Sequence, residues 1–283
     1  MSIEKFKPII WAKNIEEGLK RDSVFYEDTN HEYEGIAREP GDTIKIKGLG
    51  EPSLRLWTDG KLHQLNTPET IEDLSMVIPM NHVADYNFFV DDLDKAQTEG
   101  NLLDKYTAKA KDKIMNEEDK FIAGMALDAS VKKITSSDTL TSDKNFLKMI
   151  DNAYATLMEN DVPSTADVIL TLSWRYLNVL RDQYQVLDTD NHEMLKNGRV
   201  GMYHNIIVKV SNNIPVVGTG QNATEYFQLR TRNAVSFVRP YIHMEAYRPE
   251  EYFADAVKGY SLFDGKVTAP KEIVALQVPK ISA

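Results

Sequence analysis

The sequence predicts an α+β protein of extended outline, and three observations lead to this class. Residues 1–37 read as a peripheral arm rather than as part of a core. A polar run rich in Gly, Pro, Thr and Asp, residues 48–68, separates two predicted strands and is longer than most connections inside compact domains. Apolar residues at helical spacing continue over residues 93–127, which would form a helix of roughly 50 Å. A helix of that length suits the spine of an extended subunit.

The arm carries a short apolar patch near its start. Phe6, Ile9 and Trp11 belong to it, and nothing downstream in the sequence obviously covers them. We therefore expect these three residues to contact a neighbouring subunit. An N-terminal strand or helix packed on its own core is the alternative.

Residues 38–84 are expected to form a long hairpin loop. Residues 43–48 alternate apolar with charged side chains, as a half-solvated strand does, and residues 71–84 return in a composition that favours strands. A hairpin of this length is plausible if it lies across another subunit. Its contact candidates are Lys45, Lys47, Trp57 and Lys61.

Helices and strands alternate between residues 135 and 227, which indicates a mixed α/β domain. We expect a polar connector at 135–141, helices at 145–159 and 173–184, and strands at 166–172, 200–202 and 206–210. Residues 217–222 read as a flexible loop, in which Gly218 and Gly220 are contact candidates. After it we expect strands at 233–238 and 243–246, a short amphipathic helix at 249–258, a turn at 259–266 and an extended end at 267–278.

Composition and charge exclude several classes of protein. The chain has 283 residues, a net charge of −10 and no cysteine, so disulfides and thiolate metal sites are excluded. Its lysines and arginines form no basic cluster, which disfavours direct binding of nucleic acid. No run of about 18 apolar residues is present to span a membrane, and the first residues do not resemble a secretion signal.

No motif for catalysis or metal binding is recognisable. The six histidines lack a partner three to five residues away, as helical zinc motifs require. The acidic stretch at 188–193 fails the calcium-loop pattern, because His192 and Glu193 stand where Asp or Asn and then Gly are needed. Carboxylates are abundant, so a catalytic pair of a general acid and a general base is not excluded, but no motif identifies such a pair. We expect no enzyme activity, no catalytic or cofactor-binding residue and no metal site.

Four segments resemble the major capsid proteins of tailed bacteriophages. They are residues 6–12 (FKPIIWA), residues 33–46 (from YEGI through PGDTIKI), residues 88–97 (FFVDDLDKAQ) and residues 248–259 (RPEEYFADAVKG). They occur in the family's order, and the third is the most specific. The resemblance implies the Hong Kong 97-like fold: an N-terminal arm (1–37), an extended loop (38–84), a peripheral domain with the spine helix (85–134 and 228–283) and an axial domain (135–227).

The same resemblance implies a function and a set of partners. The subunits would form pentamers and hexamers of an icosahedral phage head that encloses double-stranded DNA, assembled in the host cytoplasm. A separate scaffolding protein, a portal protein and a decoration protein would be partners, and packaged DNA would lie close without specific binding. Some relatives cross-link through lysine and asparagine. No asparagine matches that pattern here, so Lys45, Lys47 and Lys61 are expected to be solvated. The alternatives are an encapsulin-type protein compartment and a cytosolic α/β enzyme.

Overall fold

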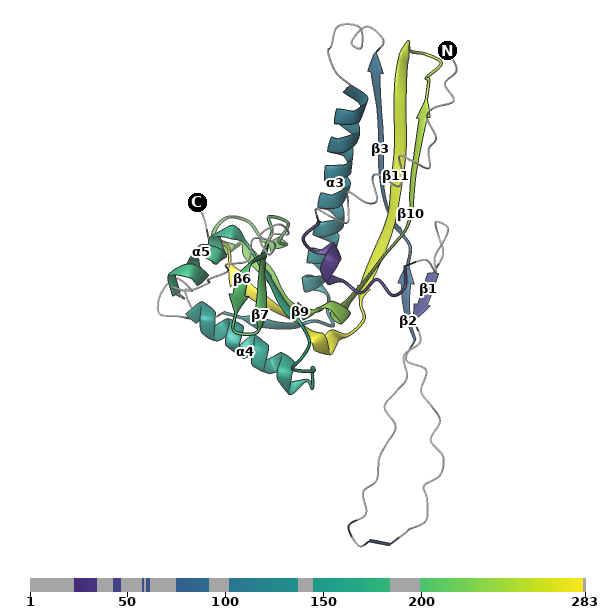
Figure 1. The fold of residues 1–283 in the computed structure, drawn as a ribbon. Coiled ribbons are helices and arrows are strands. Elements are labelled where there is room, and N and C mark those ends of the chain that lie inside the picture. Colours follow the sequence, from purple (N-terminus) through teal and green to yellow (C-terminus); the bar gives the residue numbers. More distant parts are fainter. Residues whose placement is uncertain are drawn as a thin grey trace.

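The computed structural model describes residues 23–34, 43–46, 58, 60–61, 75–91, 102–136, 145–183 and 199–281. Within these ranges the chain contains three sheets and three α-helices (Figure 1). The helices are α3 (Leu102–Gly124), α4 (Asn145–Glu159) and α5 (Trp174–Gln183). Short 3-10 helices occur at Tyr26–Asp28, Met125–Leu127, Gly220–Asn222, Arg232–Ala234 and Pro270–Glu272.

A long three-stranded antiparallel sheet lies beside α3. Its order is β10 (Val235–Tyr247), β11 (Ala254–Val267) and β3 (His82–Asp91). Figure 1 shows this sheet and α3 running side by side, away from the compact part of the molecule. A small apolar cluster, Ile114, Met115, Met244 and Val257, joins the helix to one face of the sheet.

A second sheet forms the centre of the compact part. Its order is β4 (Lys132–Thr135), β12 (Ile273–Pro279), β9 (Thr224–Thr231), β5 (Val168–Leu172), β7 (Ile206–Val210) and β6 (Arg199–Tyr203), and β8 (Val216–Val217) also pairs with β9. Alternation along β9 separates its two faces. Phe227 meets Phe146 of α4 and Tyr176 of α5, whereas Gln228 donates to the carbonyls of Ile122 and Ala123 at the end of α3. The sheet is therefore packed between two helices and the base of α3.

The hairpin predicted at residues 38–84 has a paired base. Strands β1 (Thr43–Ile46) and β2 (Met76–Pro79) are antiparallel. Ile44 and Ile78 are buried and belong to a cluster that includes Val238 and Leu262 of the long sheet. The hairpin base is thus packed on that sheet.

Several predictions for single elements are confirmed, with small changes at the ends. The helix predicted at 145–159 has these bounds, and the strand and helix after it begin one or two residues later than predicted. The predicted spine helix is α3 from Leu102, continued to Leu127 as a 3-10 helix; residues 92–101 of that prediction lie outside the described residues. The strands predicted at 233–238 and 243–246 are one strand, β10.

The predicted helix at 249–258 and turn at 259–266 are wrong, because residues 250–253 form bends and β11 then runs from Ala254 through the whole predicted turn. Its glycines do not mark a turn. A Cβ atom at Gly259 would lie 2.5 Å from the hydroxyl oxygen of Tyr86, and one at Gly265 would lie 2.8 Å from the Ser236 carbonyl. Both glycines permit close packing in a strand that is paired on its two sides.

The predicted division into an arm and domains stays a prediction, to which the structure adds three facts. Phe25 and Tyr26, inside the predicted arm, are buried in the main core. The boundary at residue 228 falls within β9, and β12 is paired between β4 and β9. The compact sheet therefore includes strands from both predicted domains.

Candidate assembly surfaces

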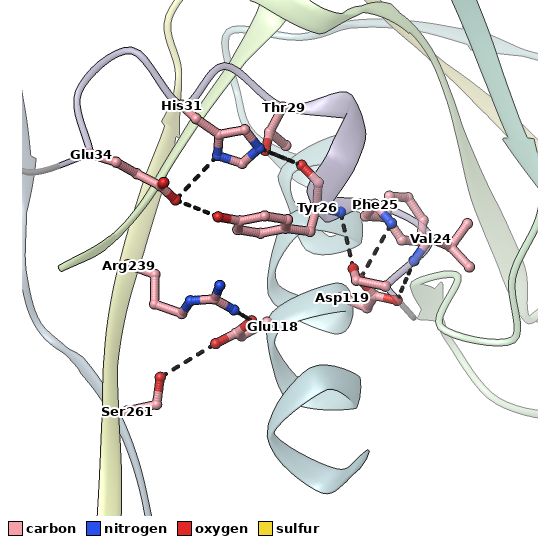
Figure 2. Close-up of polar contacts among 11 residues, drawn as sticks. Val24, Phe25, Tyr26, Thr29, His31, Glu34, Glu118, Asp119, Arg239 and Ser261 are labelled. Atoms are coloured by element: carbon pink, nitrogen blue, oxygen red, sulfur yellow. Dashed lines mark hydrogen bonds and ion pairs between the residues drawn. The ribbon is translucent and has the colours of Figure 1, made fainter. Parts of the chain in front are cut away.

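Residues 23–34 are held on α3 by the carboxylate of Asp119 (Figure 2). Ser23 donates its hydroxyl to that carboxylate, and the backbone N–H groups of Val24 and Phe25 donate at 3.3 Å each. The acceptor thus sits at the start of the 3-10 helix, where backbone donors lack partners within the helix. Burial raises the pKa of Asp119, although these hydrogen bonds favour its charged form.

A buried ion pair joins α3 to the long sheet. Arg239 donates from Nη1 to Oε2 of Glu118 at 3.0 Å, and the side chains are 2% and 1% exposed. The register of β10 with β11 shifts between Val238 and Tyr241; bulges of this kind re-aim a side chain. The guanidinium also lies 4.6 Å from the ring centre of Tyr26. Burial raises the pKa of Glu118, and the attraction of Arg239 opposes that rise.

A second set of buried charges joins residues 23–34 to the compact sheet. Arg230 of β9 donates to the carbonyls of Asp28 and Phe25, and Lys209 of β7 forms an ion pair with Asp28 at 2.6 Å. Complete burial lowers the pKa of Arg230 to about 10, against the attraction of Asp28 and Asp119. Together the two networks connect the N-terminal segment, α3 and both large sheets in one rigid junction.

Glu34 completes the outer side of this junction. It accepts from the Tyr26 hydroxyl at 2.6 Å and lies 3.3 Å from Nδ1 of His31, as Figure 2 shows. Burial alone would raise the pKa of Glu34, but the contacts with His31 and Tyr26 outweigh it and the pKa is lowered.

The hairpin base is fixed through Asp264 of β11. Its carboxylate accepts from the backbone N–H of Asn81 and from Nδ1 of His82, both at 3.0 Å. Lys266 donates to the carbonyl of Val77 at 3.3 Å. Charged hydrogen bonds therefore add to the apolar cluster that packs the hairpin base on the long sheet.

Three aromatic side chains are exposed at the far end of the long sheet. Phe253 is 83% exposed, and Tyr252 and Phe89 are 58% and 56% exposed. Phe89 stacks on Tyr252 with ring centres 5.5 Å apart. We call these residues the aromatic tip. Large exposed apolar groups that gather in one place mark interaction sites, so the tip is a candidate contact between subunits.

The sequence-predicted contact residues fall into two groups. Phe6, Ile9, Trp11, Lys47 and Trp57 lie outside the described residues. Lys45 and Lys61 are exposed, Lys45 within β1. Gly218 and Gly220 are exposed in the turn between β8 and β9, with φ of 90° and 63°. Lys45 lies in the two-stranded sheet, whereas the two glycines lie in a turn beside the compact sheet, so the structure places them on different elements.

The aromatic tip was missed from sequence, because the prediction assigned residues 249–258 to a helix. The sequence does contain part of the pattern that indicates exposed aromatic residues here. Tyr252 and Phe253 follow Pro249 and two glutamates, and adjacent aromatic residues in such a polar turn are unusual for a core.

Over the described ranges, no group of three or more histidine or carboxylate side chains is arranged to hold a metal ion. Over the same ranges no helix is long and apolar enough to cross a membrane.

No protein-family model and no curated protein matches the chain. Solved structures match over nearly its whole length. A chain of Mycobacterium phage Che8 is 24% identical, covers 90% of this chain and 91% of its own length, and has a TM-score of 0.72. The capsid of Ralstonia phage GP4 is 11% identical, with 93% and 92% covered and a TM-score of 0.70. A virus-like particle from Pyrococcus furiosus is 13% identical, with 97% and 100% covered and a TM-score of 0.59. The chain has the fold of tailed-phage capsid proteins.

Proposed function

We propose that the chain is the major capsid protein of a tailed bacteriophage. Copies of it form the pentamers and hexamers of an icosahedral head around double-stranded DNA. The observation that carries this proposal is the match to phage capsid structures over about nine-tenths of both chains. A match of that extent leaves little of the chain for an added catalytic domain.

The shape of the subunit supports a role in assembly. The aromatic tip lies at one end of the long sheet and is exposed in the single subunit, so contact with a neighbouring molecule would bury it. The rigid junction holds α3 on the long sheet through Arg239 and Glu118, and it holds the N-terminal segment on the compact sheet through Lys209 and Asp28. A shell needs such fixed directions, because a closed assembly forms only if every contact repeats at the same angles.

The partners follow from this role. They are further copies of the chain, a separate scaffolding protein, a portal protein and a decoration protein, with packaged DNA close by but not specifically bound. The subunit is structural and has no catalytic residue, and its destination is the virion after assembly in the host cytoplasm. Residues 38–84 lie over an adjacent subunit, with Lys45 and Lys61 among the contacts, and residues 135–227 lie near the capsomer axis with Gly218 and Gly220.

A protein compartment that encloses an enzyme is the second candidate, favoured by the likeness to the Pyrococcus furiosus particle. The two candidates differ in contents. A phage head forms with a portal and fills with DNA, whereas a compartment closes without a portal around a cargo protein.

The test is expression with and without the neighbouring phage genes, followed by electron microscopy. We expect empty shells or capsomers in the presence of the scaffold and portal genes. A soluble monomer that never assembles under any of these conditions would refute the proposal and favour a cytosolic enzyme. Closed shells loaded with a host protein, with no portal, would favour the compartment.

Replacement of Phe253 by aspartate tests the aromatic tip. Phe253 is 83% exposed, so the subunit should keep its fold by circular dichroism. A charge buried at an interface without a partner costs several kcal/mol, so we expect the yield of shells to fall at least tenfold. Phe253→Leu keeps an apolar side chain and should still assemble. Equal yields from the two variants would remove the tip from the assembly contacts.

A further inference from the structure

The outer edges of the two large sheets are protected to different degrees. The β10 edge carries Pro240, a register shift between Val238 and Tyr241, and a bridge from Asn30 to Ser236. The β4 edge is four residues long and carries two exposed lysines, and the β6 edge is interrupted by a register shift. Prolines, lysines, bulges and short strands are the devices that keep a sheet edge from pairing with another strand.

The β3 edge has none of these devices. It pairs with β11 over ten consecutive residue pairs without a shift, and its sequence, HVADYNFFVD, contains neither lysine nor proline. No strand in the described part of the chain pairs with its other side. Val83 and Phe89 of this strand are 52% and 56% exposed. A long regular edge with exposed apolar side chains is a template for another strand.

Helix α3 leaves this edge accessible. The helix is anchored towards the middle of the sheet, where Glu118 contacts Arg239 of β10 and Ser261 of β11. A groove of about 710 Å³ lies between the helix and β3, and residues 84–88 line it. Because successive side chains of a strand point to opposite faces, a groove that all five residues line extends round the edge of β3. The space beside the edge is therefore open to an incoming strand.

The side chains of β3 are complementary to those of a second β3 strand. In an antiparallel pair of identical strands centred on Tyr86, Asp85 lies opposite Asn87 of the second copy, and Val83 lies opposite Phe89 of the second copy. The exposed face thus pairs acid with amide and apolar with apolar side chains. A two-fold axis forms each of these pairs twice.

Other registers of the same two strands are less favourable. A shift by one residue sets the exposed side chains of one copy opposite side chains that point to the other face. A shift by two residues in one direction sets Asp85 opposite the same residue of the second copy, where the like charges repel. A shift by two in the other direction sets Asp85 opposite Phe89. The register centred on Tyr86 is therefore the one that the sequence of β3 favours.

We propose that two copies of the chain pair edge to edge through β3, antiparallel and centred on Tyr86. The two long sheets then form one continuous sheet, with both copies of α3 on the same face and the two grooves between them. Phe89 belongs to the aromatic tip as well as to this edge, so the two proposed contacts adjoin. The pairing goes beyond the proposed shell function, because it concerns two subunits and needs no pentamer or hexamer.

Cysteine cross-linking tests the register, because the chain has no cysteine of its own. Asp85→Cys and Asn87→Cys change exposed residues. The full-length, unassembled variants are oxidised in about 0.15 M salt, which screens the repulsion between two chains of net charge −10. Opposite residues of antiparallel strands lie about 4.5–5.5 Å apart at Cα, within reach of a disulfide, whereas diagonal neighbours lie about 7–8 Å apart.

We expect an equal mixture of the two variants to form cross-linked dimers on a non-reducing gel, and each variant alone to form far fewer. Cross-linking of either variant alone to the same extent as the mixture would place the strands in another register and overturn the proposal. So would the absence of cross-linked dimers from every sample.

A charge swap provides a second measurement. Asn87→Asp sets two carboxylates opposite each other, and the new carboxylate can still accept from the Tyr247 hydroxyl, as Asn87 does at 3.1 Å. We expect the dissociation constant of the dimer, measured by analytical ultracentrifugation, to rise about threefold to tenfold. Asp85→Asn/Asn87→Asp sets one acid opposite one amide again and keeps the original net charge, so it should dimerise like the wild type.

Equal dissociation constants for Asn87→Asp and the wild type would contradict the pairing, and so would a double variant as weak as Asn87→Asp. Failure of the wild type to form shells would count against the capsid function alone, because both measurements use the unassembled subunit. The two proposals can therefore fail separately.

Discussion

Replacement of Gly259 by alanine should destabilise the long sheet. The added Cβ would lie 2.5 Å from Oη and 2.6 Å from Cζ of Tyr86, and 2.8 Å from the backbone carbonyl of His243. Real Cβ atoms essentially never come within 3.0 Å of a neighbour. The Tyr86 ring is packed under α3 in an apolar cluster, and the carbonyl belongs to the adjacent strand, so neither can move freely.

Overpacking of this kind costs about 1–3 kcal/mol, and alanine regains up to about 1 kcal/mol because it is less flexible than glycine in the unfolded chain. The clash involves both a ring and a backbone atom, so we expect a net loss of about 2 kcal/mol. For a chain of this size, that lowers the melting temperature by about 5 °C. The assay is thermal and urea unfolding of the unassembled subunit.

Gly124→Ala is the matched control. Nothing lies within 4 Å of a Cβ atom there, and alanine favours a helix by about 1 kcal/mol over glycine, so this variant should be neutral or more stable. A double-mutant cycle with Tyr86→Ala identifies the cause. If the ring is responsible, Gly259→Ala should cost at least about 1 kcal/mol less once Tyr86 is alanine. A Gly259→Ala variant as stable as the wild type would refute the reasoning.

Two further predictions concern the rigid junction. Arg239→Met leaves Glu118 buried without its partner and should cost about 3–5 kcal/mol in urea unfolding, whereas Arg239→Met/Glu118→Leu should regain most of that loss; an equal loss in both variants would contradict this. For Asp119, burial raises the folded-state pKa above the unfolded value of about 3.9, so its contribution is complete below the unfolded pKa and is lost as the pH rises through the folded pKa. The stability advantage of the wild type over Asp119→Asn should therefore shrink between pH 4 and pH 7, and an advantage that grows with pH would show that the hydrogen bonds outweigh burial.

Sequence reasoning succeeded where one face of an element is apolar. Helix α4 has buried residues such as Phe146, Ile150 and Leu157 at helical spacing, with exposed residues between them, and the prediction gave its bounds. The hairpin base was recognisable because Thr43–Ile46 alternates between exposed and buried side chains. In both cases one short segment contains the whole periodic pattern of buried and exposed residues, so the pattern can be recognised from that segment alone.

The same reasoning failed for β11, which is the middle strand of its sheet. Its residues Leu262, Phe263 and Asp264 are all buried, because β3 and β10 flank it and other elements cover parts of both faces. Alternation is lost under these conditions, and Gly259 and Gly265 then resemble turn signals. Close neighbours from other segments, such as Tyr86 beside Gly259 and Ser236 beside Gly265, explain why glycine stands there.

The buried charged residues of the junction were the hardest feature to predict from the sequence. Their positions also indicate how α3 and the N-terminal segment are held in place. Glu118, Arg230 and Arg239 look like ordinary surface residues in the sequence, and their partners come from segments about 100 to 200 residues away. Burying such pairs adds little net stability compared with apolar packing. A displaced arrangement, however, would leave each charge without a partner, at a cost of several kcal/mol. We infer that these residues fix one position of α3 and the N-terminal segment between the two large sheets. If the aromatic tip contacts neighbouring subunits as proposed, that single position matters more than additional stability, because a rotation at the junction would displace the tip.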